Sequence, residues 1–448
     1  MSLADGYVRI GCGSGFASDR LEPAIALARS GRVDYLGFDA LAERTLAYAQ
    51  VRRRADASEG YDTRLHETVA GLAPSLRDGL KVIGSFGGAN VERAAEIIVE
   101  QLRACGDRGV RVGAISGDDV LDVVRRLDPE IEELGATVGE LGDRVVSANA
   151  YLGAAEIVAA LGEGAQWVVG GRLSDPSLYV GPICHEFGWA LDDWDRVAHA
   201  TLVGHILECS THVTGGFFAD PPYREVPRLH DLGFPLAEVA DREAVITKLD
   251  GTGGLVDERI VAAQVSYEVH DPAAYQNPDI TADFTQVTTE DVGPDRVRVC
   301  GARGNPPPPR FKVLVGVDLG WKMVGEISYA AAGCLTRARL AAEIIAETVA
   351  GMGAEVDESR YDLHGIDTLV GPSFRPADED PAEVRLRVAA RCRDRDVAEE
   401  LSLEVERLYL EGPAGGGGVT RRIEPALGVF PIYIDADSVN PSVRYLES

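Results

Sequence analysis

Residues 165–216 read AQWVVGGRLSDPSLYVGPICHEFGWALDDWDRVAHATLVGHILECSTHVTGG, and this stretch decides how the chain is interpreted. It begins with a short apolar run, turns at Gly170 and Gly171, and continues into stretches of helical length. It also holds four of the eight histidines and two of the seven cysteines. A short apolar strand that leads through a glycine turn into a helix is the repeating unit of a parallel α/β sheet.

The same unit is repeated through the N-terminal half of the chain. Predicted strands over residues 7–11, 80–85, 110–115 and 144–147 each end in a polar or glycine-containing turn before a helical stretch. The helices are expected over residues 91–105, 120–127 and 154–161, and one long helix is expected over residues 21–50. This alternation predicts right-handed βαβ units and a doubly wound, mostly parallel α/β sheet over residues 1–222.

After Gly216 the pattern changes to a proline-rich segment followed by strands and helices of mixed order. Strands are predicted over residues 245–249, 297–302 and 383–392, and residues 311–317 and 322–329 are expected to form a hairpin. Helices are predicted over residues 257–269, 336–351 and 395–409, with a glycine-rich loop at 411–418. These elements predict a C-terminal α+β domain over residues 223–448.

Polar side chains follow the predicted strands at the point where each strand ends. Because the carboxyl ends of parallel strands open on the same edge of a sheet, these side chains are expected to converge on a substrate-binding crevice. Turn chemistry by itself also favours Asn, Asp and Ser at such positions. The turn around Ser14 resembles a nucleotide fingerprint, but Ser18 stands where that motif needs glycine. The candidate substrate-binding residues at this edge are Ser14, Asn90, Asp118, Asp119, Asn149, Arg172 and Asp175.

Two groups of residues, one of them outside this set, point to an anionic ligand. Arg172 suits recognition of a carboxylate or phosphate, with Asp175 either orienting the guanidinium or capping the helix that follows. Lys248, followed by Asp-Gly-Thr-Gly-Gly with Gly253, is expected to place an ammonium group beside backbone N–H donors for a phosphate or an oxyanion.

The histidine-rich part of the stretch supplies the candidate catalytic residues. His205, Glu208 and Cys209 are predicted to share one face of a helix over residues 197–213, together with His212. This set suits proton transfer, a cysteine nucleophile with a histidine base, or a divalent metal, and core packing explains it equally well. His185 is a further candidate acid or base because imidazole titrates near neutrality, although a packing role is an equal alternative. No metal ligand is assigned, and the cofactor stays open.

Composition excludes several classes of function. The net charge is −28, with acids spread along the chain, which disfavours binding to nucleic acid or to an anionic membrane. Apolar runs shorter than the ~20 residues of a membrane span, and an N-terminus without a signal-peptide pattern, favour a cytoplasmic protein. Seven dispersed cysteines without a CxxC pair favour reduced thiols.

The chain contains, in this order, the motifs RIGCGSGFASDR, GSFGGAN, SGDD, NAYLGA, GGRLSDPSL, HEFGW, GHILEC with VTGG, TKLDGTGGLV, DPAAY, DRVRVCGARG and GPAGGGG. Taken together, these motifs resemble the acyclic terpene utilisation (AtuA-like) family. The resemblance covers nearly the whole chain. It implies a role in bacterial degradation of citronellol- and geraniol-type terpenoids and related branched acids.

Together these observations predict an enzyme of carboxylate or acyl-CoA catabolism, of the lyase or hydratase class. Its substrate is expected to be a terpenoid-derived or branched acyl compound, and the protein is expected to form a homo-oligomer. The alternative is a non-catalytic binding or assembly subunit that serves an acyl-CoA carboxylase-type pathway.

Overall fold

The computed structural model describes residues 6–369, 371 and 381–448. The chain forms two compact units, one of residues 1–315 and 429–448 and the other of residues 316–428. Within the described residues, no helix combines the length and the apolar character that crossing a membrane requires.

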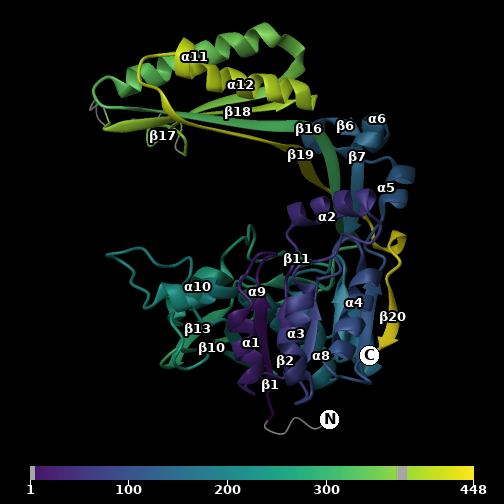
Figure 1. Cartoon of the computed structure of the whole chain (residues 1–448). Coiled ribbons are helices and arrows are strands. Elements are labelled where there is room, and N and C mark those ends of the chain that lie inside the picture. The colour runs from purple at the N-terminus through teal and green to yellow at the C-terminus, as the bar shows by residue number, and fades with distance from the viewer. Residues whose placement is uncertain (1–5, 370, 372–380) are drawn as a thin grey trace. The chain divides into compact units, whose positions relative to one another are not determined.

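The first unit is built on a ten-stranded mixed sheet with the order β13-β14-β10-β9-β1-β2-β3-β8-β4-β20 (Figure 1). Its central strands β1, β2, β3, β8 and β4 are parallel to one another, whereas β9, β10, β14 and β13 on one side and β20 on the other run antiparallel to their neighbours. The strands are β1 (Val8–Ser14), β2 (Tyr35–Phe38), β3 (Lys81–Gly84), β4 (Arg111–Ser116), β8 (Trp167–Gly170), β9 (Pro235–Val239), β10 (Glu243–Lys248), β13 (Thr288–Gly293), β14 (Arg296–Cys300) and β20 (Ser442–Glu447).

The predicted α/β class is therefore confirmed, but the sheet is mixed rather than mostly parallel. The predicted strand over residues 144–147 is present as β7 (Val145–Ala150), but it lies outside the ten-stranded sheet. The predicted domain boundary at 222/223 also differs from the observed units. Strands β9 and β10 follow that boundary, yet they extend the same sheet, because β9 pairs with β1 and β10 pairs with β9.

The long helix predicted over residues 21–50 is wrong. The structure has α1 (Glu22–Arg29), then β2, and then α2 (Glu43–Ala55) in that region. Gly31 follows α1 with a φ of 66°, a left-handed conformation that glycine adopts easily and that interrupts a helix. The buried run from Tyr35 to Phe38 then pairs with β1 and β3, so tertiary pairing overrides the local helical pattern.

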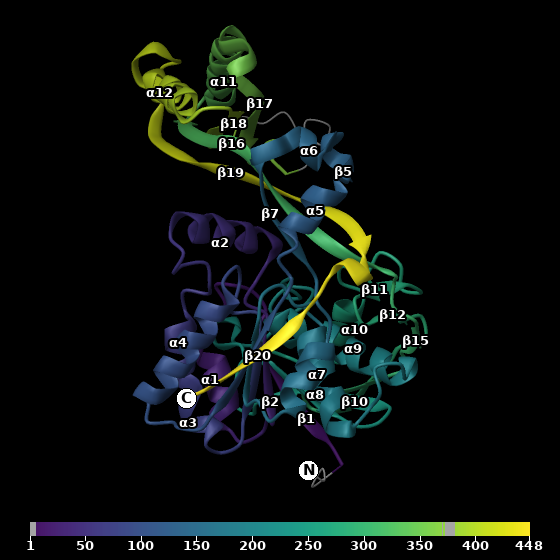
Figure 2. The same ribbon diagram turned by 90° about the vertical axis from the view of Figure 1, so that its right-hand side faces the viewer.

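Helices cover both faces of the parallel part of the sheet, which Figure 2 shows edge-on with β20 toward the viewer. Helices α1, α3 (Leu65–Leu76) and α4 (Val91–Ala104) lie on one face, and α7 (Ala155–Gly162), α8 (Ser177–Phe187) and α9 (Trp194–Glu208) lie on the other. The core on the first face is centred on aromatic rings: Phe86 lies 5.0 Å from Phe38 and 6.2 Å from Trp167 between ring centroids. Burial of these rings is a main source of apolar stabilisation.

Smaller elements complete the first unit. A three-stranded sheet contains β11 (Tyr275–Asn277), β12 (Ile280–Asp283) and β15 (Arg303–Asn305), and α10 (Glu258–Val265) packs near α9. Between β4 and β7 the chain forms α5 (Leu121–Leu127), β5 (Glu130–Ile131), β6 (Ala136–Thr137) and α6 (Val138–Leu141).

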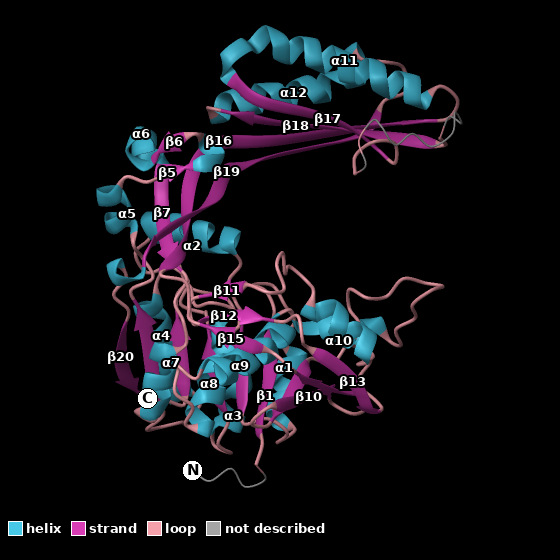
Figure 3. Ribbon diagram, turned by 180° about the vertical axis from the view of Figure 1, so that it is seen from behind, coloured by secondary structure: helices cyan, strands magenta, loops and turns pink. Residues whose placement is uncertain are grey.

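The second unit is an antiparallel sheet with two helices on one face (Figure 3). It contains parts of β16 (Arg310–Ala330) and β19 (Gly417–Asp435), with β17 (Val356–His364), β18 (Glu383–Cys392), α11 (Cys334–Met352) and α12 (Arg395–Glu411). Leu386, Val388 and Val405 are fully buried between the sheet and the helices. The predicted hairpin at residues 311–329 is wrong, because β16 continues through it as one strand, with Gly320 in a left-handed conformation at φ 88°.

Gly37 in β2 provides a test of this architecture. A Cβ atom at this position would lie 2.7 Å from the ring of Tyr179 on α8, so Gly37→Ala forces the strand and the helix apart. We expect a loss of about 1–3 kcal/mol and a lower melting temperature, measured by thermal unfolding. Gly162→Ala is the matched control, because nothing lies within 4 Å of its added methyl group, and unchanged stability in both variants would contradict this packing.

Candidate functional site

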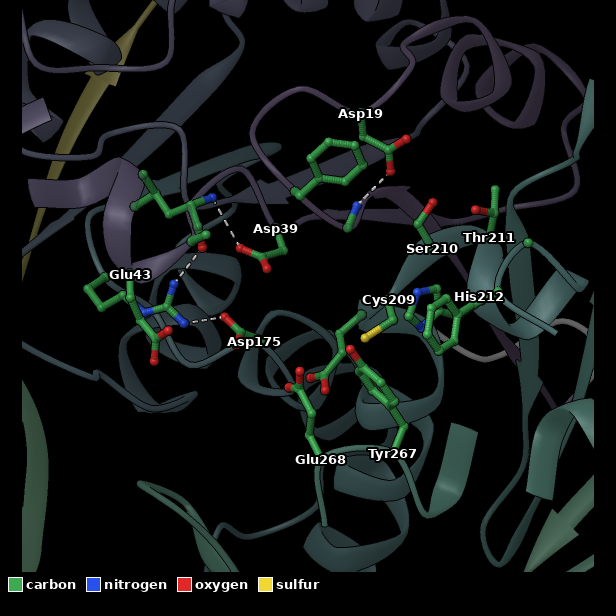
Figure 4. A pocket seen from close by; sticks show the side chains of 18 of the residues that line it. Asp19, Asp39, Glu43, Asp175, Cys209, Ser210, Thr211, His212, Tyr267 and Glu268 are labelled. Atoms are coloured by element: carbon green, nitrogen blue, oxygen red, sulfur yellow. Dashed lines mark hydrogen bonds and ion pairs between the residues drawn. The ribbon is translucent and has the colours of Figure 1, made fainter. Parts of the chain in front are cut away.

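A cavity of about 530 Å³ lies in the first unit at the carboxyl ends of the parallel strands (Figure 4). Its walls come from the turns after β1, β2 and β8, from the end of α9, and from residues that follow α10. The lining residues are Gly15, Phe16, Asp19, Asp39, Leu41, Ala42, Glu43, Tyr151, Arg172, Asp175, Glu208, Cys209, Ser210, Thr211, His212, Gly216, Phe217, Tyr267 and Glu268. The predicted crevice at this edge of the sheet therefore exists, and it is rich in carboxyl groups.

Arg172 is the buried cation of this cavity, with only 2% of its surface exposed. Its Nη1 donates to the Leu41 carbonyl at 2.7 Å, and its Nη2 donates to the Asp175 carboxylate. The guanidinium also lies 4.2 Å from the centroid of the Tyr151 ring, a cation–π geometry. Arg172 is thus held by the turn after β2, by its own turn and by Tyr151, which makes it a rigid positive charge.

Asp39 and Asp175 are the two acids whose charges interact most strongly with Arg172. Burial raises the pKa of Asp39 well above its ordinary value, and the negative charge of Asp175 raises it further against the lowering effect of Arg172. Burial likewise raises the pKa of Asp175, although Arg172 lowers it. Since the two acids disfavour each other's ionisation, the pair favours retaining a proton beside Arg172.

Asp39 is not among the residues predicted from the sequence, because the predicted helix over residues 21–50 covers β2. The run VDYLGFD at residues 33–39 is nevertheless a strand followed by an acid.

His205 and Glu208 form a buried hydrogen-bonded pair at the end of α9. His205 Nδ1 lies 3.0 Å from Glu208 Oε1, and the His205 ring packs against Tyr275 and Phe284 with centroids 5.0 and 5.8 Å away. Burial raises the pKa of Glu208 to about 7, against the lowering effect of His205. Burial lowers the pKa of His205, but the hydrogen bond and charge of Glu208 outweigh it, so the net shift is upward. Glu208 lines the cavity and His205 lies behind it.

The predicted helix over residues 197–213 is too long, which changes the setting of Cys209 and His212. Helix α9 ends at Glu208, and residues Ser210–Thr214 form a 3₁₀ helix with Cys209 between them. Burial and the charge of Glu208 raise the pKa of Cys209, so its thiol is protonated near neutrality and the geometry does not favour a thiolate nucleophile. His212 stacks on Phe217 at 4.9 Å and meets the edge of Tyr267 at 5.0 Å. Among the described residues, no group of three or more His, Cys, Asp or Glu side chains is placed to hold a metal ion.

Several predicted binding residues support the cavity without lining it. Asn149 Nδ2 donates to Asp118 at 2.9 Å, and Asp118 also accepts the backbone N–H of Arg172 at 2.9 Å. Asp119 forms an isolated bridge with Asn149, and Ser14 Oγ donates to the Asp39 carbonyl at 2.9 Å. These contacts fix the backbone conformation of the turns that carry Arg172 and Asp39.

The remaining candidates lie away from the cavity lining. Asn90 caps α4, accepting from the backbone N–H of Arg93. His185 lies near the far end of α8, where the adjacent Glu186 pairs with Lys81, the first residue of β3, at 2.7 Å. That is the opposite edge of the sheet.

Lys248 and Gly253 also lie outside the lining. Lys248 pairs with Asp295 at 3.0 Å and donates to the Thr252 carbonyl at 3.3 Å, so its charge is already neutralised. At Gly253 an added Cβ would lie 2.3 Å from the Arg228 carbonyl, so close backbone approach explains the glycine.

The fold and cavity define an α/β protein with an acid-rich cavity at the carboxyl ends of parallel strands, the place where α/β sheets of this kind commonly bind ligands. The family described as "Acyclic terpene utilisation family protein AtuA" matches residues 8–445, and the chain belongs to this family. Searches of curated proteins and of solved structures give no match.

The raised pKa of Glu208 predicts how stability depends on pH. Because burial raises this pKa from 4.5 to about 7, the folded state binds the proton more tightly than the unfolded state. The resulting stabilisation is complete below about pH 4.5 and is lost as the pH rises to about 7, and the raised pKa of His205 acts in the same direction. The free energy of unfolding of the wild-type protein should therefore fall between pH 5 and pH 8. In Glu208→Gln we expect this fall to be smaller by on the order of 1–3 kcal/mol. Equal losses in both proteins, measured by chemical denaturation, would contradict the assignment.

Proposed function

We propose that this protein is an acid–base enzyme of the hydratase or lyase class that acts on a branched or terpenoid-derived acyl substrate. Glu208 is the proton-transferring residue in this proposal, and His205 positions it and adjusts its pKa. The family to which the chain belongs is described by its role in acyclic terpene utilisation, which supports the choice of substrate class.

The observation that carries the proposal is the buried His205–Glu208 pair at the wall of the cavity. A carboxyl group with a pKa of about 7 exchanges its proton readily in both directions near neutral pH, as a general acid and base must. The histidine supports this role because its Nδ1 holds one carboxylate oxygen at 3.0 Å. Glu208 Oε2 is buried without a hydrogen-bond partner among the described residues, so a substrate or water could satisfy it.

Other residues that line the cavity supply the groups that polarise the substrate. In Figure 4, Asp39, Glu43 and Asp175 lie on one side of the cavity, and Ser210, Thr211 and His212 lie on the other. The raised pKa values of Asp39 and Asp175 favour a protonated carboxyl group there, which donates a hydrogen bond to a carbonyl oxygen. Arg172 stabilises negative charge that develops on that oxygen.

In the hydration direction, the Glu208 carboxylate accepts a proton from water as the water oxygen adds to the β carbon of an unsaturated acyl group. The electrons of the double bond move toward the carbonyl, where Arg172 and the protonated acid stabilise them. Glu208 then gives this proton to the α carbon, which completes the addition and restores the carboxylate. The reverse sequence is dehydration. A buried acid with a raised pKa at the wall of a cavity, hydrogen-bonded to a histidine, is an arrangement typical of acid–base sites, and for this reason we favour catalysis over the assembly alternative.

The direct test replaces Glu208 by glutamine and measures hydration of branched enoyl thioesters and of the free unsaturated acids. We expect kcat to fall by about 10²–10⁴-fold, because glutamine keeps the shape of the side chain but cannot transfer the proton. His205→Gln should reduce kcat less and shift the pH profile of kcat/KM, which a purely structural role would not do.

Glu92→Gln is the matched control, because Glu92 is an exposed acid on the first turn of α4. It undergoes the same chemical change and should retain full turnover. Wild-type turnover by Glu208→Gln on every substrate that the protein converts would refute the proposal.

A further inference from the structure

A second cavity of about 410 Å³ adjoins the first within the same unit. Tyr151 and Asp175 line both cavities, so the two share a wall beside Arg172. The proposed function makes use of the first cavity alone. The second cavity differs in chemistry, because prolines and aromatic rings, among them Phe311 and Tyr433, form much of its lining.

One polar group at this lining has a fixed orientation and an unused donor. Asn277 is 8% exposed, and its Oδ1 accepts the backbone N–H groups of Asp279 at 2.9 Å and Ile280 at 3.1 Å. Those two donors require the oxygen on that side, so the amide nitrogen must lie on the other. Asn277 Nδ2 is buried and has no hydrogen-bond partner among the described residues. An unsatisfied buried donor is unfavourable, so a ligand that presents an acceptor oxygen is expected here.

The same cavity carries a positive charge without a partner carboxylate. Arg310 is exposed, its guanidinium lies 5.7 Å from the centroid of the Tyr433 ring, and no carboxylate of the described residues pairs with it. The neighbouring cation Lys312, by contrast, is paired with Glu43 at 3.2 Å. In a chain with a net charge of −28, an arginine left free beside an aromatic cavity suits a negatively charged ligand group.

We propose that the second cavity binds the far end of the substrate: an apolar stem that bears an acceptor oxygen and ends in an anionic group. Asn277 Nδ2 donates to the acceptor oxygen, and Arg310 binds the terminal phosphate or carboxylate. The inference rests on the proposed function, because it takes the reacting acyl group to lie at Glu208. The stem then passes Tyr151 and Asp175 from one cavity to the other.

Two kinds of substrate carry such an end, and direct binding distinguishes them. Isovaleryl-coenzyme A represents a thioester with a phosphate-bearing carrier, and 3-methylglutarate represents a branched dicarboxylic acid. Isovaleryl-pantetheine has the acyl group and an amide-bearing stem but no phosphate, so it is the uncharged probe. Titration calorimetry with the full-length protein gives a Kd for each probe.

We expect Arg310→Gln to weaken binding of the preferred anionic probe by roughly tenfold and to leave the uncharged probe within about twofold. Asn277→Ala should weaken the preferred anionic probe severalfold as well. Arg29→Gln removes the same charge from an exposed position at the end of α1 and should leave every Kd unchanged. Wild-type Kd values of Arg310→Gln for both anionic probes, or binding of neither probe to the wild-type protein, would overturn the inference.

Turnover by Glu208→Gln and binding by Arg310→Gln, measured side by side, separate this inference from the proposed function. Full turnover by Glu208→Gln, together with weakened binding by Arg310→Gln, would refute the catalytic role while supporting the second cavity. Lost turnover in Glu208→Gln with an unchanged Kd in Arg310→Gln would support the catalytic role of Glu208 and refute the binding role of the second cavity.

Discussion

The buried guanidinium of Arg172 is the interaction on which the site depends. Moving a charged side chain out of water is costly unless it is paired and hydrogen-bonded, and Arg172 meets that condition through Asp175, the Leu41 carbonyl and the Tyr151 ring. Its partners come from the turns after β2 and β8, at the edge of the ten-stranded sheet, and from the residue after β7, which lies outside that sheet, so one side chain joins three separate parts of the chain. The Asp118–Asn149 pair fixes its backbone, which explains why these buried polar residues are present without lining the cavity.

Acids can gather in this cavity because Arg172 offsets part of their repulsion. Asp39, Asp175 and Glu208 all have raised pKa values, with burial as the first cause in each case. In water these three groups would be ionised at neutral pH, and a cavity lined by three carboxylates would repel an acyl substrate with negative charge. Burial instead favours protonated forms, which turns repulsive groups into hydrogen-bond donors and proton carriers. Burial thus has two effects: it lowers the stability of the fold at high pH, and it gives these acids the raised pKa values on which the proposed proton transfer depends.

Much of the site could be anticipated from residue types and local order. Arg172, Asp175, Glu208 and Cys209 line the cavity, and their placement follows from strand-turn-helix order and from the helix that precedes Glu208. Asp39 could not be assigned while residues 21–50 were taken as one helix, because a four-residue strand is short enough for flanking helical patterns to hide it. His185 failed for a different reason: an eleven-residue helix carries it from the cavity edge to the opposite edge of the sheet. His185 is close in sequence to the residues of the cavity, but the length of the helix places it far from them in space.

The sequence by itself determined the α/β class, the family, and the edge of the sheet at which polar groups gather. The class and the edge follow from local periodicity and from the rule that parallel strands end on the same edge, whereas the family follows from the resemblance of motifs along the chain; none of these needs a contact between distant residues. Only the tertiary structure decided that β9 and β10 extend the first sheet, that Lys248 is neutralised by Asp295, and that no carboxylate in the described part of the chain pairs with Arg310. Strand pairing, burial and charge balance are set by residues far apart in the chain. For this reason the raised pKa of Glu208, and the proton transfer that we propose for it, arise only when the chain is folded.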